Sequence, residues 1–180
     1  MRYILIFITS ILLFSCNQKA ETTENQDLPF FHFDEVEYYH KDIIKKDLMA
    51  IERKEDKTRK EQALLQILTG NVPVSIKDTL FIKNMEILGF KKNTIDRKLN
   101  PKISHLFSFR EVLKTVSPTS NPDFCDVLIF RRDHHIIGMA KVSFYGSKHQ
   151  MIGERYNDSN FGQSGEYKEL KKILEQYKKT

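Results

Sequence analysis

The apolar run over residues 124–131 constrains the fold most, because its apolar side chains fall on both alternating sides of an extended chain. Leu128 and Phe130 lie on one side, and Val127 and Ile129 lie on the other. A strand with one face in water alternates apolar with polar residues, whereas a strand covered on both faces does not. Residues 124–131 are therefore predicted to form a central strand between two apolar layers.

A second apolar run covers residues 136–145 and is joined to the first by Asp133-His134-His135. A short polar connection between two such runs is typical of a β-hairpin, which we expect over about residues 124–145. The Gly146-Ser147 pair then predicts a turn into a third strand over residues 148–153.

The first half of the chain has helical spacing instead. Apolar residues at intervals of three and four predict helices over residues 43–53, 58–69, 78–89 and 100–107. Thr58, Asp78 and Asn100 are the expected N-caps, and a proline follows Asn100 at the first helical position. A final helix is predicted over residues 164–178, with Ser164 as its cap.

An antiparallel sheet that follows a helical first half predicts an α+β fold, with a single globular domain over residues 30–180. One further strand is expected over residues 30–40, a stretch rich in aromatic residues. Its aromatic side chains exceed what one strand face can bury: Phe30, Phe31, Phe33, Tyr38 and Tyr39. We expect this strand to be covered on both sides; the alternative is an aromatic surface that meets a partner.

The N-terminal residues have the composition of a secretory leader. Arg2 precedes an apolar stretch that ends at Phe14, too short to cross a hydrocarbon core of ~30 Å. The sequence Leu13-Phe14-Ser15-Cys16 resembles the lipobox of bacterial lipoproteins. The resemblance implies that residues 1–15 are a signal peptide and that Cys16 carries a diacylglycerol and an acylated amino terminus. The alternative is an ordinary secreted protein whose leader contains a cysteine.

Residues 16–29 are polar and lack aromatic side chains, which predicts a flexible tether between the anchor and the domain. Asn17, rather than an aspartate, follows Cys16, and the resemblance to lipoproteins with this feature implies the outer membrane of the bacterial cell envelope. Two or more acyl chains hold a protein firmly on a bilayer, since each buried CH₂ contributes ~0.8 kcal/mol. A lipid bilayer is thus an expected partner, reached through Cys16.

Charge and cysteine content indicate which partners to expect and whether a disulfide bond stabilises the fold. The chain has 29 basic and 24 acidic side chains, and the two signs are interleaved along it. We therefore expect no nucleic-acid partner. The chain has two cysteines, so acylation of Cys16 leaves Cys125 without a partner for an internal disulfide bond.

The best candidates for metal ligands are His134, His135 and His149, together with Asp133, because neutral imidazole binds Zn²⁺ or Cu²⁺ well. Such a site needs three or four converging ligands, whereas adjacent residues of a strand point to opposite faces. We therefore expect His134 and His135 to be solvated turn residues, and we expect no metal ion and no cofactor.

The remaining candidates predict no catalytic site. Cys125 lies within the apolar run, where a free cysteine behaves as a small apolar residue and not as a thiolate nucleophile. The stretch Gly162-Gln163-Ser164-Gly165 lacks the G-x-S-x-G spacing of a nucleophile elbow and predicts a turn. Glu35 and Glu37 are expected to face solvent from one side of a strand, and Arg131-Arg132 is expected to end a strand.

The stretches at residues 126–130, 138–144 and 160–167 resemble those of a group of small bacterial proteins without an assigned activity. In that group a hairpin precedes a turn into a C-terminal helix. The resemblance covers the C-terminal third of the chain and implies no activity. Members often carry cysteines after the second strand, where this chain has Ser143 and Tyr145, so the resemblance implies no thiol or metal chemistry here.

These observations favour a membrane-anchored envelope lipoprotein that acts through protein contacts and not through catalysis. One specific version is an immunity or inhibitor protein, tethered where an incoming toxin arrives. A competing hypothesis is a small envelope hydrolase or metal-dependent enzyme, which would require His134, His135 and His149 to converge with Asp133. A third is a small-ligand binding module with the hairpin and the final helix as walls.

Overall fold

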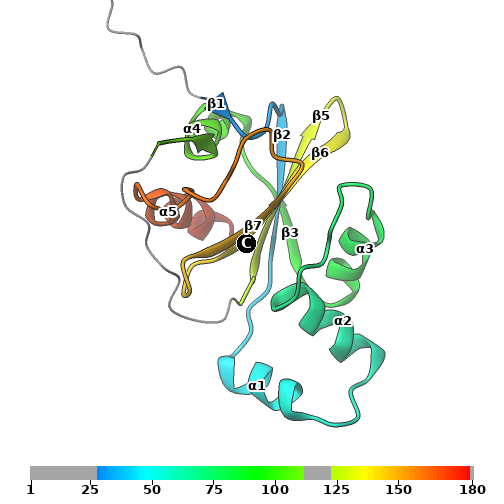
Figure 1. Ribbon diagram of the computed structural model, residues 1–180. Coiled ribbons are helices and arrows are strands. Elements are labelled where there is room, and N and C mark those ends of the chain that lie inside the picture. Colours follow the sequence, from blue (N-terminus) through cyan, green and yellow to red (C-terminus); the bar gives the residue numbers. More distant parts are fainter. Residues whose placement is uncertain (1–27, 112–122, 179–180) are drawn as a thin grey trace, which may run out of the picture.

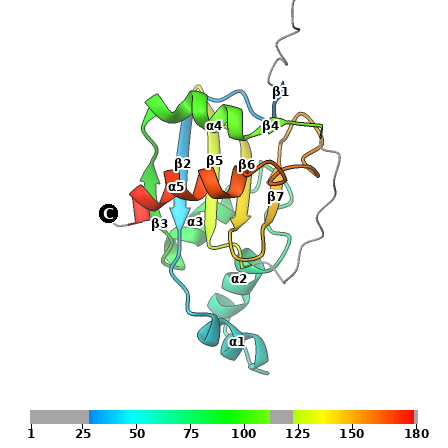
Figure 2. The same ribbon diagram turned by 90° about the vertical axis from the view of Figure 1, so that its left-hand side faces the viewer.

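The structure is a computed structural model that describes residues 28–111 and 123–178. The predicted signal peptide, Cys16 and nearly all of the predicted tether lie outside the described residues. The domain that follows them is built around one sheet with helices on both of its faces (Figures 1 and 2).

Within the described residues, the main sheet has five antiparallel strands in the order β3-β2-β5-β6-β7. Their bounds are Glu35–His40 for β2, Lys91–Thr94 for β3, Asp126–Arg132 for β5, His135–Ser143 for β6 and Lys148–Ile152 for β7. The predicted central strand, hairpin and third strand are confirmed as β5, β6 and β7. A short pair, β1 (Leu28–Pro29) with β4 (Ser108–Phe109), lies at one end of the sheet.

Helices α4 (Asn100–Leu106) and α5 (Glu166–Lys178) cover one face of the sheet (Figure 2). On the other side lie α2 (Arg59–Leu68) and α3 (Leu80–Ile87), with α1 (Lys45–Arg53) at the far end (Figure 1). The α+β prediction is confirmed, and the helices of the first half divide between the two faces.

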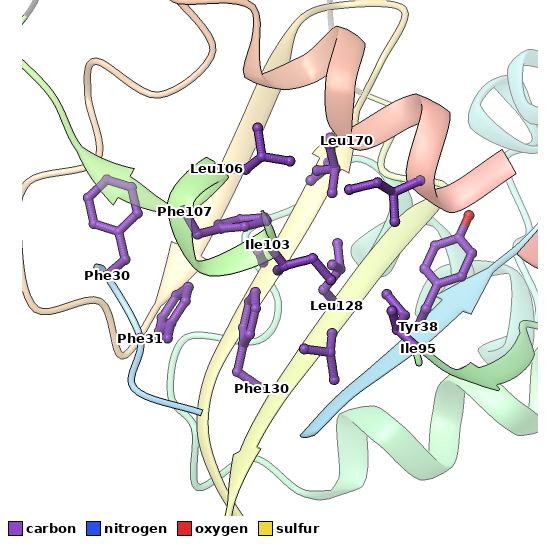
Figure 3. Close-up of a cluster of buried hydrophobic side chains, with 14 of the residues drawn as sticks. Phe30, Phe31, Tyr38, Ile95, Ile103, Leu106, Phe107, Leu128, Phe130 and Leu170 are labelled. Atoms are coloured by element: carbon purple, nitrogen blue, oxygen red, sulfur yellow. The ribbon is translucent and has the colours of Figure 1, made fainter. Parts of the chain in front are cut away.

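Two separate apolar cores follow from this arrangement. Leu128 and Phe130 belong to the core under α4 and α5 (Figure 3). Val127 and Ile129 belong to the core under α2 and α3. The aromatic side chains of the first strand region are divided in the same way and are at most 2% exposed: Phe30, Phe31, Tyr38 and Tyr39. The prediction that this region is covered on both sides is confirmed.

The first strand is shorter than the predicted stretch of residues 30–40. β2 starts at Glu35, and Phe31 lies before it in a loop, where its ring stacks on Phe130 at a centroid distance of 4.3 Å. The edge strand β3 was not predicted, because its sequence Lys-Lys-Asn-Thr has no apolar alternation. Lysines on an edge strand are a common protection against pairing with another chain.

Some predicted helix ends are confirmed. Thr58 and Glu61 form a reciprocal capping box at the start of α2. The N-cap of α3 is Thr79, one residue after the predicted Asp78, although the Asp78 carboxylate accepts a hydrogen bond from the Phe81 amide. Gly89 follows α3 with a φ of 79°, a backbone conformation that favours glycine.

Two other predicted caps are wrong. Asn100 continues a 3₁₀ turn, Arg97–Leu99, directly into α4, and its side-chain amide donates to the Asp34 carbonyl at 2.8 Å. The final helix begins at Glu166, and the amides of Lys168 and Glu169 donate to the Gly165 carbonyl, so the cap position is Gly165 and not Ser164.

Gly138 lies where β6 passes under the Phe31 ring, and this contact leaves no space for a side chain. A Cβ atom at Gly138 would lie 2.3 Å from Phe31 Cδ1. We expect Gly138→Ala to lower the free energy of unfolding by about 1–3 kcal/mol in urea unfolding. Phe31→Leu in the Gly138→Ala background should recover part of this loss, and strictly additive losses would contradict the proposed clash.

Candidate functional site

Buried polar groups gather where β2 ends and β5 begins. His40, the last residue of β2, stands directly opposite Asp126, the first residue of β5. Lys178 at the end of α5 reaches the same point from the face of the sheet. We call Tyr38, His40, Asp42, Asp126 and Lys178 the Asp126 network.

Asp126 is the centre of the network. It is 4% exposed, and its Oδ1 atom accepts from Tyr38 Oη, from His40 Nδ1 at 2.9 Å and from Lys178 Nζ at 3.0 Å. The other ring nitrogen of His40, Nε2, lies 2.9 Å from Asp42 Oδ1. His40 therefore bridges a buried and an exposed carboxylate, which is the arrangement expected of a protonated imidazole.

The pKa values of the network follow from this geometry. Burial opposes the charged form of His40, but its hydrogen bonds to Asp126 and Asp42 outweigh burial and hold its pKa above the ordinary 6.5. Burial likewise opposes ionisation of Asp126, yet the contacts with His40, Lys178 and Tyr38 keep its pKa below 3.8. Burial and the Asp126 charge raise the pKa of Tyr38, so Tyr38 stays a neutral donor.

A surface cavity of about 500 Å³ opens beside the network. The end of the hairpin and the final helix both contribute to its lining, which includes His40, Asp42, Cys125, Asp126, Tyr145 and Lys178. Lys45 extends from the start of α1 toward this cavity, and its Nζ lies 4.8 Å from the centroid of the Tyr145 ring. The cavity thus has charged walls of both signs and an aromatic rim.

The groups that line the cavity are not arranged for nucleophilic catalysis. Burial raises the pKa of the Cys125 thiol to about 12, so the thiolate is scarcely populated at neutral pH. Both ring nitrogens of His40 are held by carboxylates, which leaves the imidazole no free lone pair to act as a general base. The prediction that Cys125 is not an activated nucleophile agrees with this environment.

The histidines singled out as metal candidates are not brought together. His134 and His135 lie at the hairpin turn, where His135 Nδ1 lies 2.8 Å from the Asp133 carbonyl oxygen. His149 pairs with Val142 at the opposite end of β6 and contacts Tyr167 Oη through Nδ1 at 2.8 Å. No group of three metal-capable side chains suited to an ion occurs in the parts of the chain that the structure describes.

One predicted surface residue is buried. Glu37 was expected to face solvent, but its carboxylate pairs with Lys92 at 2.8 Å and with Arg131 at 3.1 Å on the two neighbouring strands. Burial opposes its ionisation, and these two cations still lower its pKa. Glu37 thus ties β3, β2 and β5 together.

We expect the Asp126 network to make stability depend on pH. The pKa of His40 is higher in the folded state than in the unfolded state. Its contribution to the free energy of unfolding is therefore complete below pH 6.5 and is lost as the pH rises through the folded-state pKa. His40→Gln should therefore lose more unfolding free energy at pH 5.5 than at pH 8.5, measured by urea unfolding. His32→Gln, at an exposed position outside the network, is the control. An equal loss at both pH values would contradict the assignment.

Comparisons of the chain with protein-family models, with curated proteins and with solved structures find no match. Among the described residues, no helix has the length and apolar character needed to span a membrane. The site therefore has to be interpreted from its own geometry.

Proposed function

We propose that the chain is a lipoprotein of the bacterial cell envelope, anchored in the outer membrane through acylated Cys16. In this proposal its folded domain acts by binding a protein partner, and the binding surface is the rim of the cavity beside the Asp126 network. The leader and lipobox pattern support the anchor. The arrangement of the domain supports the binding surface.

The observation that carries this proposal is that the described part of the chain begins at the end of the sheet opposite α1 (Figures 1 and 2). β1, the first described element after Cys16, lies at one end of the sheet, and α1 lies at the other end in both views (Figures 1 and 2). Residues 17–27 span at most about 40 Å when extended. A domain attached through β1 on such a tether is able to turn its α1 end away from the bilayer.

Exposed apolar side chains gather at that distal end. Ile44 is 69% exposed and Tyr145 is 76% exposed, although both are large apolar residues. Tyr145 lines the cavity beside the Asp126 network, and Ile44 lines an adjoining cavity that shares Lys41, Asp42 and Ile43 with it. Apolar and aromatic groups surrounded by charged ones are typical of the centre of a protein interface.

A small-ligand binding module is the second candidate, favoured by the cavity itself. Its walls come from the end of the hairpin, with Phe144 and Tyr145, and from α5, with Lys171 and Lys178. Acidic and basic groups line the same space, which suits a small ligand that carries both charges. Native mass spectrometry of the purified chain, with and without Lys171→Ala, would detect a co-purified small molecule held there.

The lipid anchor predicts a sharp difference between the two cysteines. In bacteria that express the full chain, Cys16→Ser should abolish incorporation of labelled palmitate and release the protein from the membrane fraction. Cys125→Ser is the matched control and should leave palmitate incorporation and membrane association unchanged. Label retained in Cys16→Ser, or an intact starting methionine in the mass of the wild-type protein, would refute the anchor.

The proposed interface predicts a position-dependent crosslink. A photo-reactive phenylalanine analogue in place of Tyr145 should give one discrete protein adduct in intact cells, and Ile44→Asp should reduce its yield at least severalfold. The same analogue in place of Leu80, an equally exposed apolar residue on α3, is the control. Equal adducts at both positions, or none at Tyr145, would contradict a partner at the cavity rim.

A further inference from the structure

Lys141 is an unusual residue of this fold, because it is a lysine of β6 that is only 1% exposed. Its Nζ donates hydrogen bonds to the carbonyl oxygens of Gly70 and Val72, each at 2.8 Å. These carbonyls belong to the connection between α2 and α3, which runs over the outer strands of the sheet. The Lys141 side chain thus binds the backbone of the segment that connects α2 and α3.

Gln150 completes the same attachment. It stands directly opposite Lys141 on β7, and its Nε2 donates to the carbonyl oxygens of Asn71 at 2.9 Å and Pro73 at 3.2 Å. Lys141 therefore donates to the carbonyls of residues 70 and 72, and Gln150 donates to those of residues 71 and 73. Further along, Ile76 packs against Gly153, where a Cβ atom would lie 2.9 Å from Ile76 Cγ2. We call residues 69–79 the strap.

The ammonium group of Lys141 has no acidic partner in the parts of the chain that the structure describes. Its neighbours are the strap carbonyls, the Phe124 ring at 4.5 Å, Gln150 on β7 and Val127 opposite it on β5. None of these groups ionises. Burying a charge without a counter-charge is costly, whereas a neutral amine can still donate to both carbonyls.

We propose that the strap is a pH-sensitive latch, closed over β6 and β7 when Lys141 is neutral and released when Lys141 takes up a proton. In the closed form, burial lowers the pKa of Lys141 from 10.5 to about 7. In the open form the amine is in water and recovers its ordinary proton affinity. Opening is therefore coupled to proton uptake, and acidification favours the open strap.

The difference between the pKa of Lys141 in the closed form and in the open form determines how strongly the open-to-closed ratio of the strap depends on pH. Above the closed-state pKa, each unit of acidification raises the open-to-closed ratio, and below it the ratio levels off. Between pH 8 and pH 6 the ratio should rise about tenfold on this linkage. Release would also withdraw Val72 from the core under α2 and α3.

Hydrogen exchange followed by mass spectrometry tests the latch. After correction for intrinsic exchange, strap peptides of the wild-type chain should exchange about tenfold faster at pH 6 than at pH 8. Peptides of β5 in the same sample provide the internal reference. Lys141→Met should remove the pH dependence of the strap, because methionine is unbranched like lysine, only one heavy atom shorter, and has no titrating group.

Gln150→Leu is the matched control, because it weakens the strap without touching the titrating group. It should speed strap exchange at both pH values and leave the tenfold ratio intact. Should Lys141→Met fail to fold, Lys141→Arg replaces it, since a guanidinium stays charged across this range. A wild-type ratio near one, or a ratio that survives both Lys141 variants, would overturn the proposal.

Discussion

The side chains of β5 pack in two directions at once, and this double burial governs the rest of the molecule. Leu128 and Phe130 need a cover on one face, and Val127 and Ile129 need one on the other. Helices must then cover both faces, with α4 and α5 on one and α2 and α3 on the other (Figures 1 and 2). Polar groups of β5 are confined to its ends, which is why Asp126 meets His40 at the first residue pair of the strand.

Sequence patterns identify the parts of this fold that rest on local chemistry. The apolar runs predict β5 and β6, and Thr58 with Glu61 marks the start of α2 by a local capping box. β3 escapes prediction, because a polar edge strand is defined only by its pairing with β2. Asn100 resembles a cap, yet its side chain is taken by the distant Asp34 carbonyl. Such choices depend on tertiary contacts, which override local preference.

The Asp126 network could not be predicted from the sequence, because it too depends on tertiary contacts. A single acidic residue at the head of an apolar run is a weak signal, and its partners come from β2 and from the end of α5. Once formed, the network joins these elements beneath the cavity. A base of this kind suits the proposed binding surface, where Tyr145 at the cavity rim remains exposed.

The position of Lys178 has a consequence for the order of events during translation. A ribosome completes β2 and β5 long before it completes α5, so the buried carboxylate of Asp126 waits for its ammonium partner until the last helix emerges. Leu170 and Leu174 reach their core at the same late moment. A prematurely terminated chain would therefore leave Asp126 with His40 as its one cationic partner in the network, beside an uncovered apolar sheet, and proteases would remove it in preference to the finished product.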